Sequence, residues 1–223
     1  MGKLYIVPTP IGNLADITLR ALETLKNADL ILAEDTRTTK KLLNHYEIAN
    51  KLQSFHIHNE HKVLEHVIDQ IQSLEAVALV SDAGTPGISD PGFLLVRACK
   101  EAGVEVTCLP GPNALVPALV ASGIPCDRFI FEGFLPHKKG RQTKRKQIAE
   151  EERTVALYES PHRLLKCLKE IAEYLGPETL VCVAREISKI HEEFNTDLCE
   201  NLIQHYTAHP PKGEIVIIIA PKA

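Results

Sequence analysis

Short apolar runs alternate with helical patterns along the whole chain. In the first half, apolar runs that end in Gly, Pro or acidic residues predict buried strands at residues 3–7, 30–33, 52–57, 77–80 and 105–109. Between them, apolar positions at helical spacing predict helices from residue 18 and at 38–46, 60–74, 93–102 and 114–122. Asp35 or Thr36 is placed to cap the second of these helices.

The second half repeats this alternation. Strands are expected at residues 129–132, 154–158, 180–184, 190–194 and 214–220, with helices ending near 152 and spanning 163–175 and 197–206. Strands that alternate with helices in both halves predict an α/β fold. We expect two α/β domains, at residues 1–113 and 114–223, in a chain of 223 residues.

The composition limits which partners and which cellular compartment the sequence predicts. The net charge is −4, so contact with a nucleic acid has to come from a local basic segment rather than from the whole surface. The six cysteines are scattered without a Cys-x-x-Cys pair, which indicates buried thiols in a reducing compartment. No signal peptide or membrane span is apparent, and we expect a cytoplasmic protein.

The segment 81–92 is the most informative loop. It follows a buried strand and reads Ser-Asp-Ala-Gly-Thr-Pro-Gly-Ile-Ser-Asp-Pro-Gly, with glycines that let a ligand approach the main chain. The chain has neither the phosphate-binding loop of nucleotide hydrolases nor the dinucleotide fingerprint. Asp82 and Asp90, with no base beside them, suit a ligand with hydroxyls, an amine or a positive charge. Alternatively, both are ordinary turn aspartates.

A basic segment follows the first strand of the second half. Its cations are a candidate contact for an RNA backbone, because neutralised phosphates release condensed counterions. Phe131 and Phe134 lie just before it and are candidates for base stacking. A solvated basic helix face is the alternative. The basic residues are Lys138, Lys139, Arg141, Lys144, Arg145 and Lys146.

Two further groups of polar residues have less specific patterns. Residues 158–163 (Tyr-Glu-Ser-Pro-His-Arg) bring a carboxylate, an imidazole and a guanidinium to a strand end, where they could orient a hydroxyl or serve only as caps and surface pairs. His56, His58 and His61 permit a metal site, but no Asp or Cys completes it at close spacing. We therefore predict no metal and expect histidines that form hydrogen bonds or line the substrate site.

These motifs, taken in order, resemble a known family. The segments 8–14, 34–37, 56–60, 81–92, 110–113, 132–136, 158–163 and 212–214 stand as they do in tetrapyrrole-methylase-like (class III) S-adenosylmethionine methyltransferases that act on ribosomal RNA. The resemblance covers essentially the whole chain. Many family members continue past the Lys-Gly-Glu segment, and Ser188 stands where the family often has Thr.

The resemblance implies two α/β domains with S-adenosylmethionine in the cleft between them. It also implies 2′-O-methylation of a cytidine in the decoding region of 16S rRNA, in the small ribosomal subunit, by a homodimer. A sulfonium donor with ribose hydroxyls and no phosphates agrees with the Asp-bearing loop. The residues expected to hold the donor are Pro10, Ser81, Asp82, Ala83, Gly84, Gly87, Ile88, Asn113, Ala114, Leu115, Tyr158, Gly213 and Glu214.

Candidates for the chemical step lie at strand ends that face the expected cleft. Removal of a hydroxyl proton favours a carboxylate base, with Glu159 ahead of Glu34 and with His162 in reserve. Asp35 belongs to the same group, and Arg37 or Arg163 is expected to hold the neighbouring RNA phosphate.

Two other functions share some of these features. A tetrapyrrole C-methyltransferase would use the same fold and donor, but the basic segment and the 158–163 motif argue against it. A non-catalytic RNA-binding module would not need two ligand-shaped loops at strand ends.

Overall fold

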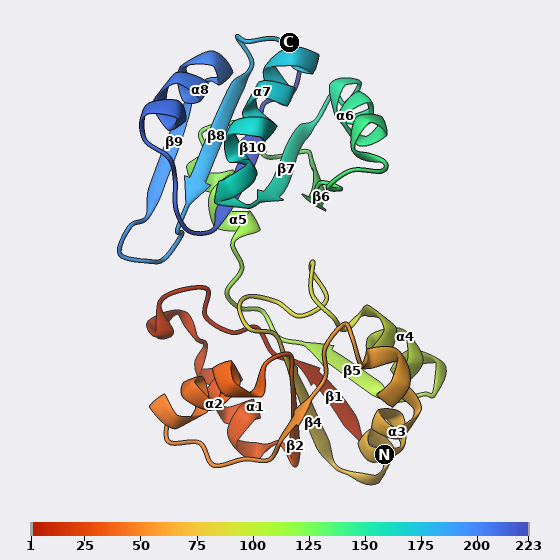
Figure 1. Cartoon of the computed structure of the whole chain (residues 1–223). Coiled ribbons are helices and arrows are strands. Elements are labelled where there is room, and N and C mark those ends of the chain that lie inside the picture. The colour runs from red at the N-terminus through yellow and green to blue at the C-terminus, as the bar shows by residue number, and fades with distance from the viewer. Residues whose placement is uncertain (1, 223) are drawn as a thin grey trace. The chain divides into compact units, whose positions relative to one another are not determined.

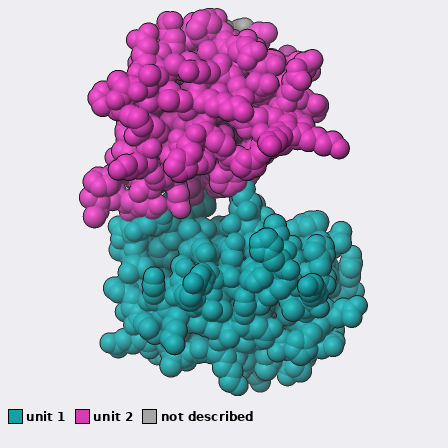
Figure 2. All heavy atoms as spheres, in the orientation of Figure 1, with its two compact units in different colours: residues 1–113 teal, residues 114–223 magenta. Residues whose placement is uncertain are grey.

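The computed structural model of the chain describes residues 2–222. The chain divides into two compact units, residues 1–113 and 114–223 (Figures 1 and 2), and each is described by itself. No helix within residues 2–222 has the length and apolar character that crossing a membrane requires.

Unit 1 is a parallel sheet covered by helices. Its strands pair in the order β3-β2-β4-β1-β5, all in parallel. The strands are β1 (Lys3–Ile6), β2 (Leu30–Ala33), β3 (Leu52–Ser54), β4 (Ala76–Val80) and β5 (Glu105–Cys108). The helical elements are the 3-10 turn η1 (Leu14–Asp16), α1 (Leu19–Asn27), α2 (Thr36–His45), α3 (Glu60–Ser73) and α4 (Phe93–Glu101).

Successive side chains of the central strands enter opposite faces of this sheet. Ile31 packs in a cluster with residues of α1 and α2, whereas Leu32 packs in a second cluster with residues of α3 and α4. Burial on both faces explains why β2 and β4 read as continuous apolar runs. Parallel pairing also brings the carboxyl ends of all strands of unit 1 to one edge, where α/β sheets bind ligands.

Unit 2 is a mixed sheet in the order β6-β7-β10-β8-β9, in which β6 and β7 are parallel and the other neighbours antiparallel. The core includes residues of α7 and α8 packed against alternate residues of β7, β8 and β10, while α5 contacts β10 (Figure 1). The strands are β6 (Phe129–Phe134), β7 (Thr154–Glu159), β8 (Leu180–Arg185), β9 (Glu193–Leu198) and β10 (Ile215–Ile219). The helical elements are α5 (Leu115–Ala121), α6 (Arg141–Ala149), the 3-10 turn η2 (Pro161–Arg163), α7 (Leu164–Leu175) and α8 (Cys199–Ala208).

The predicted α/β class is confirmed, and strands β3 and β9 differ most from the expected bounds. Strand β3 ends at Ser54 because Asn59 accepts the His56 amide at 2.8 Å and its own amide bonds back to the His56 carbonyl, which forms a turn. Strand β9 begins at Glu193, because Glu186 and Ser188 adopt positive φ values of 52° and 67° and the intervening residues turn.

Candidate functional site

Three loops converge at the carboxyl edge of the unit 1 sheet. The loop after β1 joins the loop after β4 through Thr9 and Gly84, whose amides and carbonyls form two reciprocal hydrogen bonds of 2.9 Å. The Thr9 hydroxyl also donates to the Ser81 carbonyl at 3.0 Å. In the loop after β5, a Cβ added to Gly111 would lie 2.7 Å from Cβ of Pro8, so the Pro8 ring packs closely against the Gly111 backbone. The strand-end loops thus lie together, as expected for a ligand site.

The loop after β4 presents open main chain. Gly84 and Gly87 have φ values of +79° and +87°, which side-chain-bearing residues adopt only with strain. A Cβ built on Gly87 would meet its nearest neighbour, the Phe93 amide nitrogen, at 4.0 Å. Gly87 therefore offers backbone groups that a ligand can approach without a side chain in the way. Thr85 fixes the loop by donating to the Pro112 carbonyl at 3.4 Å.

Carboxylates from two strand ends meet beside this loop. The Asp82 amide donates to Glu34 Oε2 at 3.4 Å, and the Asp35 amide donates to Asp82 Oδ1 at 3.1 Å. Asp35 also caps α2 and pairs with Arg37, with 2.6 Å between Oδ2 and Nη2. Asp35 is thus neutralised locally, whereas Glu34 and Asp82 contact neighbouring segments through amides.

The environment shifts the pKa values of these carboxyl groups in opposite directions. Hydrogen bonds from Arg37 lower the pKa of Asp35 to about 2. Burial raises the pKa of Glu34 and that of Asp82. Burial, with the charge of Glu34 second, raises the pKa of Asp90 to about 7. A cation or a hydroxyl donor suits such an edge, and a carboxyl with a raised pKa can accept a proton near neutral pH.

The histidines after β3 form local contacts. The His58 amide lies 3.2 Å from His56 Nδ1, and the two rings are 5.9 Å apart. Residues 2–222 contain no group of three or more His, Cys, Asp or Glu placed to hold a metal ion.

In unit 2, Glu159 lies at the end of β7 and is only 2% exposed. Its Oε1 accepts the Ser160 amide at 2.8 Å and lies 2.8 Å from Nη2 of Arg163. Its Oε2 lies 3.7 Å from Nη2 of Arg141 and, within residues 2–222, is buried without a hydrogen-bond partner. This position between two guanidinium groups favours a structural or positioning role over that of a base. His162, in contrast, is exposed on η2.

The basic segment divides into paired and solvent-facing cations. Arg141 is 4% exposed, and its guanidinium is bound by the Glu170 carboxylate at 2.7 to 3.2 Å. It therefore differs from the predicted RNA contact, because its charge is buried and neutralised. Lys144 lies 2.6 Å from Glu132. The exposed cations of the segment are Lys138, Lys139 and Lys146.

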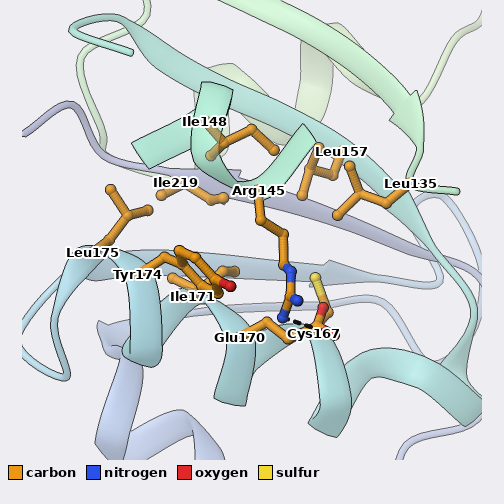
Figure 3. Close-up of a pocket in the computed structure, with 10 residues that line it drawn as sticks. All are labelled: Leu135, Arg145, Ile148, Leu157, Cys167, Glu170, Ile171, Tyr174, Leu175 and Ile219. Carbon is orange, nitrogen blue, oxygen red and sulfur yellow. Dashed lines mark ion pairs between the residues drawn. The ribbon is translucent and has the colours of Figure 1, made fainter. Parts of the chain in front are cut away.

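Arg145 is also drawn inward. Its Nη1 lies 3.3 Å from Glu170, and its guanidinium stacks on Tyr174 at 4.7 Å (Figure 3). The cavity beside it has a volume of about 20 Å³ and is lined mainly by apolar core residues such as Ile148 and Leu157. Such a volume is about that of one water molecule, so this cavity is part of the core and not a ligand site.

The aromatic residues near the basic segment pack on Tyr158. The Phe131 and Phe134 rings make edge contacts with the Tyr158 ring, at centroid distances of 4.9 and 5.6 Å. Phe134 is still 54% exposed. Phe134 therefore stays a candidate for base stacking, and the contact with Tyr158 holds its ring in place.

Gly213 and Glu214 lie in an ionic cluster. A Cβ on Gly213 would overlap the carboxyl group of Glu186, so this side chain fills the space beside the glycine. Glu186 Oε1 accepts the Glu214 amide at 2.9 Å, and Lys189 Nζ lies 2.8 Å from Glu186 and 3.0 Å from Glu214. The glycine is thus required by Glu186, whatever ligand binds nearby.

Unit 1 therefore brings residues 81–88, Glu34 and Asp35, all predicted site residues, to one sheet edge. The other predicted donor residues belong to unit 2: Ala114 and Leu115 at the start of α5, and Tyr158, Gly213 and Glu214. Two residues that organise these sites, Thr9 and Glu170, were not predicted from the sequence. The position of Thr9 between two prolines is its only signal. The helical spacing of α7 placed Glu170 on a helix but gave no indication of its buried partner Arg141.

Comparison with known proteins places these features in a family. The family model described as tetrapyrrole (corrin/porphyrin) methylases matches residues 3–202. The chain is 51% identical to ribosomal RNA small subunit methyltransferase I of Synechocystis sp., over 99% of this chain and 79% of that protein. It is 48% identical to the protein of that name from Thermotoga maritima, over the full length of both.

Solved structures share the fold at low identity. The methyltransferase CobJ superposes with a TM-score of 0.74 at 19% identity, covering 100% of this chain and 95% of that chain. Diphthine synthase gives a TM-score of 0.74 at 14% identity, over 97% and 89% of the two chains. At these identities the structures support the fold alone.

Proposed function

The chain belongs to the tetrapyrrole methylase family, alongside the ribosomal RNA small subunit methyltransferase I proteins, and we propose that it is a 16S rRNA methyltransferase. Its methyl donor is S-adenosylmethionine, and its acceptor is the ribose 2′-hydroxyl of a cytidine in the decoding region. The observation that carries this proposal is the similarity along the whole chain to relatives with that name. A homodimeric state and a cytoplasmic location are predicted with it.

The residues at the sheet edge of unit 1 fit the donor. S-adenosylmethionine carries a transferable methyl group on a sulfonium, which is a cation with ribose hydroxyls and no phosphate. The open main chain at Gly87 and the carboxylates Asp82 and Asp90 match such a ligand better than a phosphate-rich one. Main-chain groups of residues 81–88 and Asn113 would hold the donor, and Tyr158, Gly213 and Glu214 of unit 2 are proposed to contribute.

Glu34 is the proposed acceptor of the hydroxyl proton, with His162 as the second candidate. Glu34 is half-buried at the end of β2, and burial raises its pKa, which brings it nearer to the working pH of a general base. Alignment of the reacting groups can supply about 7–11 kcal/mol of the acceleration, and a base adds about 10²–10⁴-fold. Arg37 either stabilises Asp35 at the start of α2 through their ion pair or binds a neighbouring phosphate of the RNA.

The experiment is transfer of labelled methyl from S-adenosylmethionine to small ribosomal subunits that lack the modification. We expect incorporation into 16S rRNA that protects one ribose linkage against alkaline cleavage, since a 2′-O-methyl group blocks attack by the 2′-oxygen. Uroporphyrinogen, offered as the alternative acceptor, should remain unlabelled. Labelling of the tetrapyrrole and not of the RNA would overturn the proposal.

The role of Glu34 has its own test. The Glu34→Gln variant keeps an acceptor for the Asp82 amide, so donor affinity should stay near wild type. Its single-turnover methylation rate should fall at least about tenfold if the substitution removes a base. An unchanged rate would move the search for the base to His162.

A further inference from the structure

A buried ionic network in unit 2 connects Glu159 to the basic segment. It consists of two carboxylates, Glu159 and Glu170, and of Arg141, Arg145 and Arg163. The side chains of Glu159 and Arg141 are 1% and 5% exposed, and those of Arg145 and Arg163 are each 20% exposed. Each buried charge is stabilised by its oppositely charged neighbours, because an isolated charge in the interior is strongly disfavoured.

The three guanidinium groups are neutralised to different degrees. Arg141 is bound by Glu170 on two of its nitrogens, and Arg145 contacts Glu170, Glu173 and the Tyr174 ring. For Arg163, the carboxylate contact is with Glu159. Its Nε is buried without a hydrogen-bond partner in residues 2–222. Arg163 lies at the partly exposed edge of the network, and it shares its carboxylate partner, Glu159, with Arg141.

Arg163 contacts the loop that precedes α6. Its Nη1 lies 2.9 and 3.0 Å from the two ring nitrogens of the exposed His137. His137 is followed by the exposed Lys138 and Lys139. Cationic and hydrogen-bonding groups from two separate segments thus lie side by side at this loop.

The same network fixes the loop itself. Arg141 Nη1 donates to the Pro136 carbonyl at 3.2 Å, and its amide donates to the Lys138 carbonyl at 3.3 Å. Gly140 turns the chain into α6 with a φ of +85°. Glu170 holds Arg141, so one buried cluster determines the position of both the loop and Arg163.

From this arrangement we propose that His137, Lys138, Lys139 and Arg163 form a phosphate-binding clamp for the RNA substrate, and that Glu159 is its positioning residue. A guanidinium carries five N–H donors and can bind a carboxylate and a phosphate at the same time, and the contact with Glu159 uses Nη2 of Arg163. Glu159 acts through Arg163 and does not itself contact RNA. The proposal rests on the proposed RNA substrate.

The test combines Glu159→Gln, Arg163→Gln and the double variant, with RNA affinity measured over a range of salt concentrations. Arg163→Gln should weaken binding at least about tenfold, because hydrogen bonds to charged groups are among the stronger ones. The salt slope should fall by about 0.7–0.9, the value for one phosphate contact. Glu159→Gln should reproduce much of this effect, and the double variant should bind no worse than Arg163→Gln alone.

Matched controls lie at the other end of the same strand. Glu151 and Arg153 form an ion pair of 2.7 Å just before β7, so Glu151→Gln and Arg153→Gln remove the same charges away from the clamp. Both should leave the salt slope unchanged. Thermal unfolding monitors the fold of each variant, and Glu159→Asp, which keeps the charge, should restore part of the RNA affinity. Arg163→Gln, at the partly exposed edge, remains informative if Glu159→Gln fails to fold.

The outcomes separate three cases. An Arg163→Gln variant with wild-type salt slope overturns the clamp. A Glu159→Gln variant with unchanged RNA affinity but a reduced single-turnover rate at saturating RNA overturns the positioning role and restores Glu159 as the base. A wild-type protein that binds RNA with the expected salt slope but transfers no methyl group to rRNA overturns the proposed function and leaves the clamp intact.

Discussion

At the residue scale, the same carboxyl chemistry serves different purposes at Glu159 and Asp90, because their neighbours differ. Glu159 lies between the guanidinium groups of Arg141 and Arg163. Asp90 lies in a partly buried loop and feels the negative charges of Glu34 and Asp82. Two guanidinium groups hold the Glu159 side chain in place, whereas the surroundings of Asp90 raise its pKa and favour the neutral acid until the pH approaches neutrality.

Asp90 gives a prediction about stability and pH. Its pKa is raised to about 7 from 3.8, so the stability it contributes is fully present below about pH 4 and is lost as the pH rises to 7. Asp90→Asn cannot ionise, so its free energy of unfolding relative to wild type should rise between pH 4 and 7 and then level off. Denaturant unfolding over this pH range measures the difference.

Asp35→Asn is the contrasting control. The pKa of Asp35 is lowered to about 2, so its contribution is present above pH 4 and is lost as the pH falls towards 2. The Asn variant should therefore be less stable than wild type at neutral pH and should approach it in acid. Identical pH profiles for the two variants would contradict the assignment.

Arg141 gives a second prediction at this scale. Arg141→Met leaves the buried Glu170 carboxylate without its main partner, and we expect a decrease of about 3–5 kcal/mol in the free energy of unfolding. Arg153→Met removes an exposed ion pair and should have a much smaller effect. Equal effects of the two substitutions in denaturant titration would show that Arg141 is not an anchor.

At the scale of single elements, regular strands and helices follow the sequence pattern, while their ends depend on side-chain contacts. The continuous apolar runs of β2 and β4 and the helical spacing in α3 are local signals, and the elements appear at the expected positions. The early end of β3 depends on the side chain of Asn59, and the late start of β9 depends on positive φ values at Glu186 and Ser188. Neither feature produces a periodic pattern of apolar residues in the sequence.

The loop before β10 yields a prediction at this scale. Gly213→Ala places a Cβ at the position of the Glu186 carboxyl and at a φ of +88°. In a Glu186→Ala background the steric part of this cost should disappear, although the backbone strain remains. A double-mutant cycle by denaturant unfolding should give a coupling of about 0.5–3 kcal/mol. Additive effects would mean that Glu186 does not define the need for glycine.

The loop after β4 yields a prediction about the donor. Gly87→Val introduces a β-branched side chain at a φ of +87°, on the open side of the loop. We expect calorimetric titration to detect no binding of S-adenosylmethionine. Gly123→Val, in unit 2, is a control with a similar φ of +71° and open space around it, and it should leave donor affinity unchanged. Wild-type affinity in Gly87→Val would contradict the assignment of this loop.

At the scale of the whole molecule, the sequence predicted the class of the fold, which is confirmed, but not how the charges of the basic segment are distributed. Local composition identified that segment as a concentration of cations. It did not distinguish Arg141, which is buried against Glu170, from Lys138, which faces solvent. That distinction depends on contacts between α6 and α7, which are formed only when the chain folds.

This distribution leads to the prediction at the largest scale. On a chain with a net charge of −4, RNA binding has to depend on the few exposed cations, and Lys138, Lys139 and Lys146 are those of the basic segment. Replacing all three by Ala should lower the slope of RNA affinity against salt by about 0.7–0.9 for each phosphate that is no longer neutralised, while donor affinity stays constant. The matched control is Lys144→Ala, because Lys144 is already paired with Glu132 and should contribute little. A triple variant with the wild-type slope, or a Lys144→Ala variant with the larger effect, would mean that RNA does not bind to the exposed side of this segment.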